Sequence, residues 1–232
     1  MKAAVYHGPR DVRIEDVPEP EPGPGDVLVE VARNGICGSD LHTYLGSGAA
    51  NLHLPGIVLG HEFAGTVRAV GRDVDDLAVG AVVAVAPIEW CGECAPCREG
   101  KVNLCRRGGI YGGFRLPLHG GLAPLVTVSR RAAFSVPESL DPVSAALTEP
   151  VAVAVHAVRR APRTLGATVV VLGAGPIGLA VLQAVRAAGA STTIVSEPSA
   201  ARRARAASFG ASLVLDPRTD DLRAGVRDLV PA

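Results

Sequence analysis

The segment Val169-Val-Val-Leu-Gly173-Ala-Gly175-Pro-Ile-Gly178 decides the fold of the C-terminal part of this 232-residue chain. It places a Gly-x-Gly-x-x-Gly pattern directly after an apolar strand and before a helix. The first glycine of such a turn allows the tight bend, the second lets the backbone approach a pyrophosphate, and the third lets helix and strand pack closely. The free N–H groups at the start of the helix then face the phosphate. The candidate dinucleotide-binding residues are therefore Gly173, Gly175, Pro176, Ile177 and Gly178.

The flanks of this motif indicate which dinucleotide it would bind. Glu197 ends the next predicted strand, 24 residues after Gly173. A carboxylate at that place binds the hydroxyls of the adenosine ribose and repels a 2′-phosphate, which favours NAD over NADP. Arg202 and Arg203 follow closely and weaken that preference. The alternative interpretation is a structural glycine-rich turn followed by a surface glutamate.

Working outward from the motif, strands and helices alternate to the end of the chain. The pattern predicts strands over 168–172, 192–196 and 212–215 and helices over 178–188 and 199–208, with Gly189 and Gly210 where helices end. This alternation is typical of the opening half of a doubly wound parallel sheet. The uncharged stretch 167–185 is long enough for a membrane span, but its glycines and its proline favour a buried strand, a turn and a helix.

The N-terminal part of the chain follows a different pattern. Residues 1 to about 135 form short apolar segments broken by Gly and Pro, among them 27–32, 63–70 and 81–85, and they predict a β-rich domain of barrel or sandwich type. A helix is predicted over 143–160, with Asp141-Pro142 as its start.

Four cysteines lie close together in the run Cys91-Gly-Glu-Cys94-Ala-Pro-Cys97, followed by Cys105. Gaps of two residues let neighbouring thiolates turn toward one point, and Zn²⁺ takes four such sulfurs in a tetrahedron. Two disulfides or four buried thiols are the alternatives. Zinc is the preferred interpretation, because nothing else in the chain indicates an oxidising compartment.

A second metal site is suggested by residues that lie far apart in the sequence. Cys37, the one remaining cysteine, and His61 are soft ligands, and Glu149 is a carboxylate in an apolar stretch, where it needs a partner. Together they form a sulfur, nitrogen and oxygen set that leaves a position open, as catalytic zinc requires. Each of them could equally be an ordinary buried residue, so chemistry alone leaves this assembly open.

The bulk composition excludes several classes of partner. The 23 basic residues balance 23 acidic ones, so no electrostatic footprint for nucleic acid or an anionic membrane is expected. The N-terminus lacks the apolar core of a signal peptide. We therefore expect a cytoplasmic location, no nucleic acid and no membrane.

Taken together, these motifs resemble the zinc-containing medium-chain dehydrogenase/reductase family, within it most closely the butanediol, threonine and sorbitol dehydrogenase branch. The resemblance spans the chain and rests on 35–42, 59–65, 91–105, 149–158, 172–179 and 194–203. It implies an α/β protein with a GroES-like catalytic domain over 1–160 and an incomplete Rossmann domain, a doubly wound parallel sheet, over 161–232.

The resemblance also implies a role for each candidate residue. The catalytic zinc would be held by Cys37, His61 and Glu149, with Glu62 as a supporting or alternate ligand, and the structural zinc by Cys91, Cys94, Cys97 and Cys105. Ser39 and His42 would relay a proton to solvent, and Asp40 would orient His61. NAD would accept the hydride from a secondary alcohol or a vicinal diol.

The sequence departs from the family in its length, because relatives continue for roughly another hundred residues. The strand that usually forms the homo-oligomer interface would then be absent. The alternative function is a truncated, non-catalytic remnant that binds zinc, with or without NAD, and has no turnover. A zinc-free quinone-reductase-type relative is disfavoured by the four cysteines. Substrate specificity is expected to depend on residues around 42–57 and on the absent part.

Overall fold

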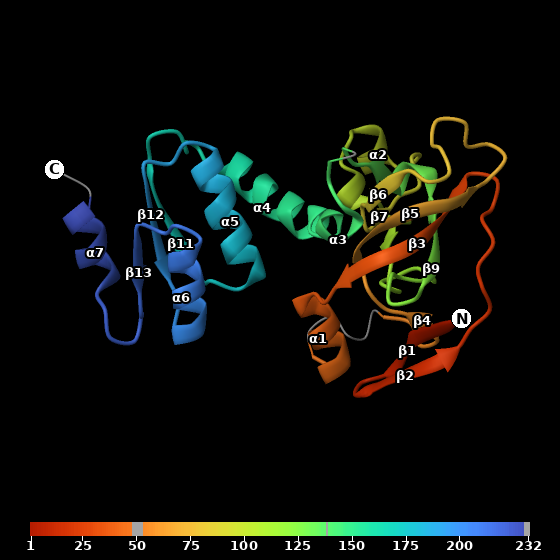
Figure 1. The fold of residues 1–232 in the computed structure, drawn as a ribbon, viewed down its shortest axis with the longest axis horizontal. Coiled ribbons are helices and arrows are strands. Elements are labelled where there is room, and N and C mark those ends of the chain that lie inside the picture. The colour runs from red at the N-terminus through yellow and green to blue at the C-terminus, as the bar shows by residue number, and fades with distance from the viewer. Residues whose placement is uncertain (48–52, 138, 230–232) are drawn as a thin grey trace. The chain divides into compact units, whose positions relative to one another are not determined.

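A computed structural model describes residues 1–47, 53–137 and 139–229 of the chain, which forms two compact units, Met1–Glu149 and Pro150–Ala232. Strands dominate the first unit, whereas strands and helices alternate in the second (Figure 1). The predicted α/β class is confirmed. The predicted domain boundary after residue 160 stays a prediction, and it coincides with the end of a helix that begins just before the division.

An antiparallel sheet of five strands forms the centre of the first unit, in the order β10-β6-β5-β3-β9. Its strands are β3 (Asp26–Gly35), β5 (Glu62–Val70), β6 (Val82–Val85), β9 (Leu125–Ser129) and β10 (Ala133–Ser135). Buried residues alternate with more exposed ones in β9 and in the first half of β3, because successive side chains of a strand point to opposite faces. Val27 pairs with Val128 and Val29 with Val126, and all four lie in one core cluster with Phe63.

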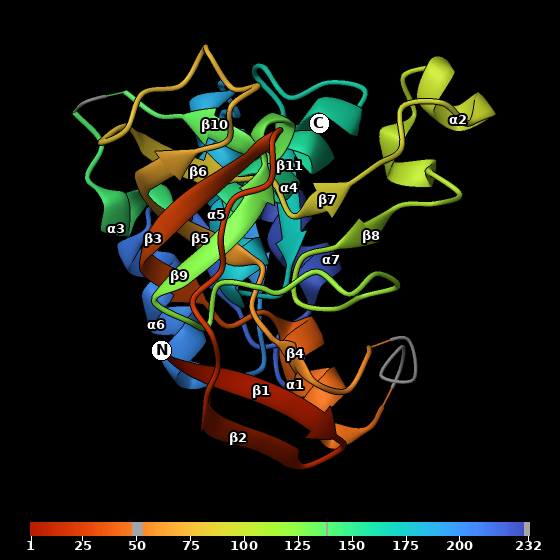
Figure 2. The ribbon, with the colours of Figure 1, turned by 90° about the vertical axis from the view of Figure 1, so that its right-hand side faces the viewer.

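Two smaller sheets complete the first unit. One has the order β2-β1-β4 and consists of β1 (Lys2–Gly8), β2 (Asp11–Asp16) and β4 (Ile57–Val58). The other is a ribbon of β7 (Ile88–Glu89) and β8 (Gly109–Ile110). A lobe with the short helix α2 (Ala95–Arg98) and a 3₁₀ turn (Val102–Leu104) protrudes from this ribbon, as Figure 2 shows. The lobe carries the four cysteines.

The helix predicted over 143–160 is broken in the structure. Helix α3 (Pro142–Ala145) and helix α4 (Thr148–Arg160) are separated by two residues. Pro150 is the cause, since its ring would clash with the carbonyl of Ala146 in a continuous helix, whereas a proline is tolerated in the first turn of a new one. The sequence pattern also missed helix α1 (Gly38–Leu45), which follows β3 directly.

The second unit is a parallel sheet with the strand order β11-β12-β13. Strands β11 (Thr168–Leu172), β12 (Thr192–Ser196) and β13 (Leu213–Leu215) are connected by α5 (Pro176–Ala187) and α6 (Ala200–Ser208), as predicted to within about two residues at each end (Figure 1). Gly189 and Gly210 follow the helices with φ of 85° and 84°, the left-handed backbone that glycine tolerates. Helix α7 (Leu222–Leu229) was not predicted.

Within the described part of the chain, no helix is long and apolar enough to cross a membrane. The uncharged stretch 167–185 is divided into strand β11, the glycine turn and most of α5, as expected.

Candidate functional site

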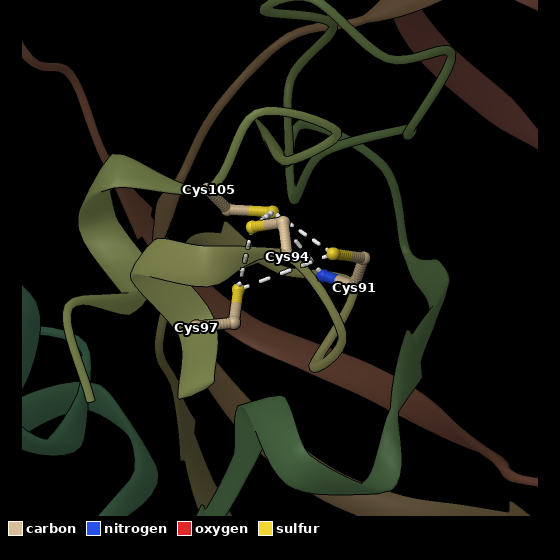
Figure 3. A group of neighbouring side chains, drawn as sticks. All are labelled: Cys91, Cys94, Cys97 and Cys105. Carbon is tan, nitrogen blue, oxygen red and sulfur yellow. Dashed lines mark hydrogen bonds between the residues drawn. The ribbon is translucent and has the colours of Figure 1, made fainter. Parts of the chain in front are cut away.

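The protruding lobe brings four sulfur atoms to one point. Cys91 follows β7, Cys94 precedes α2, Cys97 lies in α2, and Cys105 follows the 3₁₀ turn. In Figure 3 their side chains point toward one another from different sides of the lobe. The turns are therefore arranged around the cysteines, as the short spacing predicted.

The distances between these sulfurs fit one metal ion. Cys94 Sγ lies 3.4 Å from Cys97 Sγ and 3.9 Å from Cys105 Sγ, and Cys91 Sγ lies 3.5 Å from Cys105 Sγ and 4.0 Å from Cys97 Sγ. A tetrahedron with Zn–S bonds of about 2.3 Å has edges of about 3.8 Å. A disulfide requires a separation of about 2.05 Å, and all five cysteines are free. The donor set therefore fits zinc.

The local backbone also favours a thiolate in this lobe. The backbone N–H groups of Glu93 and Cys94 lower the pKa of Cys91 to about 6. The N–H of Cys91 in turn donates to Cys105 Sγ at 3.3 Å. Burial and the neighbouring sulfurs raise the pKa of Cys97 to about 12, so the lobe favours a thiolate at Cys91, and a metal ion would have to displace the proton of Cys97.

A second group of metal-binding side chains lies at the end of β3. Ligand atoms of Cys37, His61 and Glu62 lie within 4.8 Å of one another. Strand pairing causes this approach, because Gly35 of β3 pairs with Glu62 of β5 and brings the residues beyond both strand ends together. A sulfur, an imidazole nitrogen and a carboxylate are a donor set suited to zinc.

Asp40 is the buried residue that fixes this group. It is 7% exposed, and its Oδ2 accepts a hydrogen bond from the N–H of Cys37 at 2.8 Å, which holds the start of α1. Its Oδ1 lies 3.6 Å from His61 Nδ1. On the other side of the ring, His61 Nε2 lies 3.4 Å from Ser39 Oγ. Asp40 thus faces one ring nitrogen, Nδ1, and leaves the other, Nε2, toward Ser39.

The electrostatics of the group agree with this arrangement. Hydrogen bonding to His61 lowers the pKa of the Cys37 thiol, although burial acts against it. Burial lowers the pKa of His61, but the hydrogen bond to Cys37 and the charge of Asp40 outweigh it, so that the pKa is raised. Both shifts are in the direction of a thiolate and imidazolium pair, and a bound metal ion would take the place of the imidazolium proton.

Glu149 lies next to this group but outside it. Burial raises the pKa of the Glu149 carboxyl, while the charge of His61 lowers it in part. Its charge acts on both His61 and Glu62, yet the three-residue group contains Glu62 in its place. The two candidate carboxylates named from the sequence are thus both present, Glu62 in direct reach and Glu149 beside it.

The predicted relay residues both lie on α1. Ser39 and His42 are one helical turn apart, and both are exposed. His42 Nδ1 lies 3.1 Å from Ser47 Oγ. Within the described ranges no hydrogen bond joins Ser39 to His42. Part of the segment expected to shape specificity, residues 48–52 of 42–57, lies outside the described residues.

The glycine turn of the second unit has the expected geometry. Gly173 has φ of 99°, which favours glycine, and a Cβ at Gly178 would lie 2.1 Å from the carbonyl oxygen of Gly173. A Cβ at Gly175 would meet nothing within 4 Å. Gly175 also precedes α5 without a side-chain cap, and Pro176 and Ile177 form its first turn. Open space before uncapped N–H groups fits a pyrophosphate.

Glu197 lies directly beside this turn and is 3% exposed. Its Oε2 accepts from the N–H of Ala174 and its Oε1 from the N–H of Ser199, both at 2.8 Å. These two backbone donors lower the pKa of Glu197, and the charges of Arg202 and Arg203 add to the effect. The carboxylate is therefore held as an anion at the edge of the glycine turn.

Two sequence families match the chain. Residues 23–138 match the alcohol dehydrogenase GroES-like domain, and residues 176–231 match the zinc-binding dehydrogenase domain. The chain belongs to the zinc-containing medium-chain dehydrogenase/reductase family. Both halves of this family's domain pair are thus represented, in the order that the sequence motifs predicted.

Named members of the family are similar over nearly all of the chain. Sorbitol dehydrogenase of Bacillus subtilis (strain 168) is 39% identical over 95% of this chain and 62% of its own length. The (R,R)-butanediol dehydrogenase of the same organism is 38% identical over 98% and 67%, respectively. A zinc-binding dehydrogenase from Sinorhizobium meliloti 1021, solved with NADP bound, is 40% identical with a TM-score of 0.89, covering 95% of this chain and 63% of its own. The chain therefore spans somewhat under two thirds of the length of many of its medium-chain relatives.

The sequence analysis missed a cluster of charged side chains next to Glu197, formed by Asp216, Arg203 and Arg218. Asp216 is 9% exposed and lies 3.0 Å from Arg203 and 2.7 Å from Arg218. The signal for Asp216 was available, because it directly follows the strand over 213–215, at the sheet edge where ligands bind in doubly wound folds.

Proposed function

We propose that this chain carries a zinc- and NAD-dependent dehydrogenase activity toward a secondary alcohol or a vicinal diol. The observation that carries the proposal is the group of Cys37, His61 and Glu62 with buried Asp40 behind it. This donor set lies next to the exposed side chains of Ser39 and His42, where a substrate could reach it, which favours a catalytic over a structural role. The named relatives act on sorbitol and butanediol, which supports polyhydroxylated substrates.

Two metal sites belong to the proposal. Cys37 and His61, with a carboxylate from Glu149 or Glu62, would hold the catalytic ion, and the four cysteines of the lobe would hold a structural one. Zinc supplies a Lewis acid for the alcohol oxygen, and a bound nicotinamide dinucleotide supplies the hydride acceptor. Gly173, Gly175, Pro176, Ile177, Gly178, Glu197 and Arg202 would hold that dinucleotide.

The protein's own groups have two tasks in this chemistry. Asp40 would orient the His61 ring through Nδ1, which leaves Nε2 as the ring nitrogen that would bind the catalytic ion. Ser39 Oγ, 3.4 Å from His61 Nε2, would accept the proton of the alcohol, and exposed His42 would pass it to solvent. A cytoplasmic location belongs to the same proposal.

Metal content and turnover of two matched variants test this function. We expect about two zinc ions per chain in the unaltered protein and about one in each of Cys37→Ser and Cys97→Ser. Butanediol, sorbitol and L-threonine are the substrates to offer with NAD. Formation of NADH from one of them should be lost in Cys37→Ser, because this variant removes a ligand next to the reacting atoms.

Cys97→Ser is the control, since it removes the same type of atom at a distance from Ser39. It should lower thermal stability while the remaining zinc ion stays bound. Two zinc ions together with the absence of NADH formation from every alcohol tested would contradict the proposed activity and favour the non-catalytic alternative.

A further inference from the structure

The turn after strand β12 is held by an unusual concentration of charge. Arg203 Nη1 donates to the carbonyl oxygens of Glu197 and Pro198, both at 2.8 Å. Arg218 Nη2 donates to the same Pro198 oxygen at 2.5 Å. Two guanidinium groups therefore lie at the residue that directly follows the candidate ribose-binding carboxylate.

Asp216 pairs with both of these arginines. Its Oδ2 lies 3.0 Å from Arg203 Nη1 and 2.7 Å from Arg218 Nη2, and its Oδ1 accepts from Arg218 Nε at 2.9 Å. The pairing of Ser196 with Leu215 in the sheet causes this approach, because it places Glu197 and Asp216 side by side just beyond the two strands. The position of Asp216, directly after the carboxyl end of β13, is thus set by the strand pairing.

The charges at this edge balance. Arg203 and Arg218 are matched by Glu197 and Asp216. A third arginine, Arg202, acts on Glu197 through its charge, and a third carboxylate, Asp220, accepts from the N–H of Asp216 through its Oδ2 at 2.7 Å. In folds of this class, arginines near the ribose accommodate the 2′-phosphate of NADP, whereas a carboxylate near the ribose repels that phosphate. Because the arginines at these strand ends are already balanced by carboxylates, they attract a 2′-phosphate less strongly.

We propose that Asp216 is a specificity-determining residue, which pairs with Arg203 and Arg218 and thereby makes the site select NAD over NADP. The inference rests on the proposed dinucleotide site. It adds that the selection depends on the charge partner of two arginines as well as on Glu197. Asp216 acts through these arginines, so it is a positioning residue.

The test is the ratio of affinities for NADH and NADPH, measured by fluorescence titration without substrate. Asp216→Asn removes one negative charge and should shift the ratio toward NADPH by about tenfold, which corresponds to about 1.4 kcal/mol. Arg218→Gln removes a positive charge from a side chain that is 65% exposed and should shift the ratio the opposite way. A merely structural role would move the ratio in the same direction in both variants, since both loosen the turn.

Asp228→Asn is the matched control, because Asp228 is an exposed aspartate of α7 outside the cluster. It should leave the ratio unchanged. Should Asp216→Asn fail to fold, the direction of the Arg218→Gln shift decides the question. Two folded variants with the ratio of the control would overturn the role of Asp216 and leave the dinucleotide site intact. Binding of neither dinucleotide by the unaltered protein would overturn the proposed site and this inference together.

Discussion

Gly175 and Gly178 belong to the same turn but are glycines for different reasons. A Cβ at position 178 would meet the Gly173 carbonyl oxygen at 2.1 Å, whereas one at position 175 would enter open space. The first constraint concerns the packing of helix α5 on strand β11. The second concerns the space that a ligand needs. A substitution at position 178 should therefore affect folding, and one at position 175 should affect ligand binding.

Gly178→Ala should destabilise the second unit by about 1–3 kcal/mol, because the backbone has to move to relieve the overlap. Urea unfolding followed by circular dichroism measures this change. Gly175→Ala should leave the free energy of unfolding nearly unchanged and weaken NADH binding by more than about tenfold, because the methyl group occupies the place of the pyrophosphate. Equal stability of the two variants would contradict the packing argument.

Two carboxylates lie near His61, and the one expected from its sequence surroundings is not the one within direct reach. Glu149 was expected to complete the metal-binding set because it lies in an apolar stretch. The burial that raises its pKa agrees with that reasoning. Glu62 is nevertheless the carboxylate that lies within reach of Cys37 and His61, because strand pairing places it there.

At the scale of elements, the start of helix α3 depends on one side chain. Asp141 Oδ1 accepts from the N–H groups of Val143 at 2.9 Å and of Ser144 at 3.0 Å, and Pro142 occupies the first helical position. Ala145 and Ala146 at the end of this helix pack against Ala64 and Ala84 of the central sheet. The cap therefore fixes a helix that leads directly to Glu149.

Asp141→Ala should lower the free energy of unfolding by about 1 kcal/mol, the usual cost of losing a helix N-cap. Asp141→Ser is the control, since a serine hydroxyl caps equally well, and it should stay within a few tenths of the unaltered protein. Chemical denaturation of the three proteins under one buffer condition provides the comparison. A loss of equal size in both variants would mean that the charge, and not the cap, stabilises this helix.

At the scale of the whole molecule, each compact unit has a core of its own. Val27, Val29 and Phe63 belong to the first core, and Leu182 and Val195 belong to the second. Ligands are also divided between the units, since the candidate metal groups lie in the first and the glycine turn in the second. We therefore expect the two units to respond separately to their ligands.

Differential scanning calorimetry should resolve two transitions. A zinc chelator should lower only the transition of the first unit, because the cysteine lobe and the Cys37 group lose their cation. NADH at 100 times its dissociation constant should raise only the other transition, by an amount equivalent to about 2.7 kcal/mol. A single transition that both treatments move would show that the units unfold as one.

The sequence by itself determined the features whose residues are near neighbours along the chain. The cysteine lobe, the glycine turn and the alternation of strands and helices around it were predicted, because short spacings and local periodicity restrict the backbone directly. The break before helix α4 could have been found from Pro150, but the apolar pattern concealed it.

Only the tertiary structure decided which distant residues meet. Pairing of Gly35 with Glu62 brings Cys37 to His61, and pairing of Ser196 with Leu215 brings Asp216 to Glu197. The register of two strands is set by all their contacts with the core, so a shift by one residue would have turned other side chains toward each site. For that reason the sequence named Cys37, His61 and Glu62 as candidate ligands without showing how they meet, and it did not predict the position of Asp216 beside Glu197.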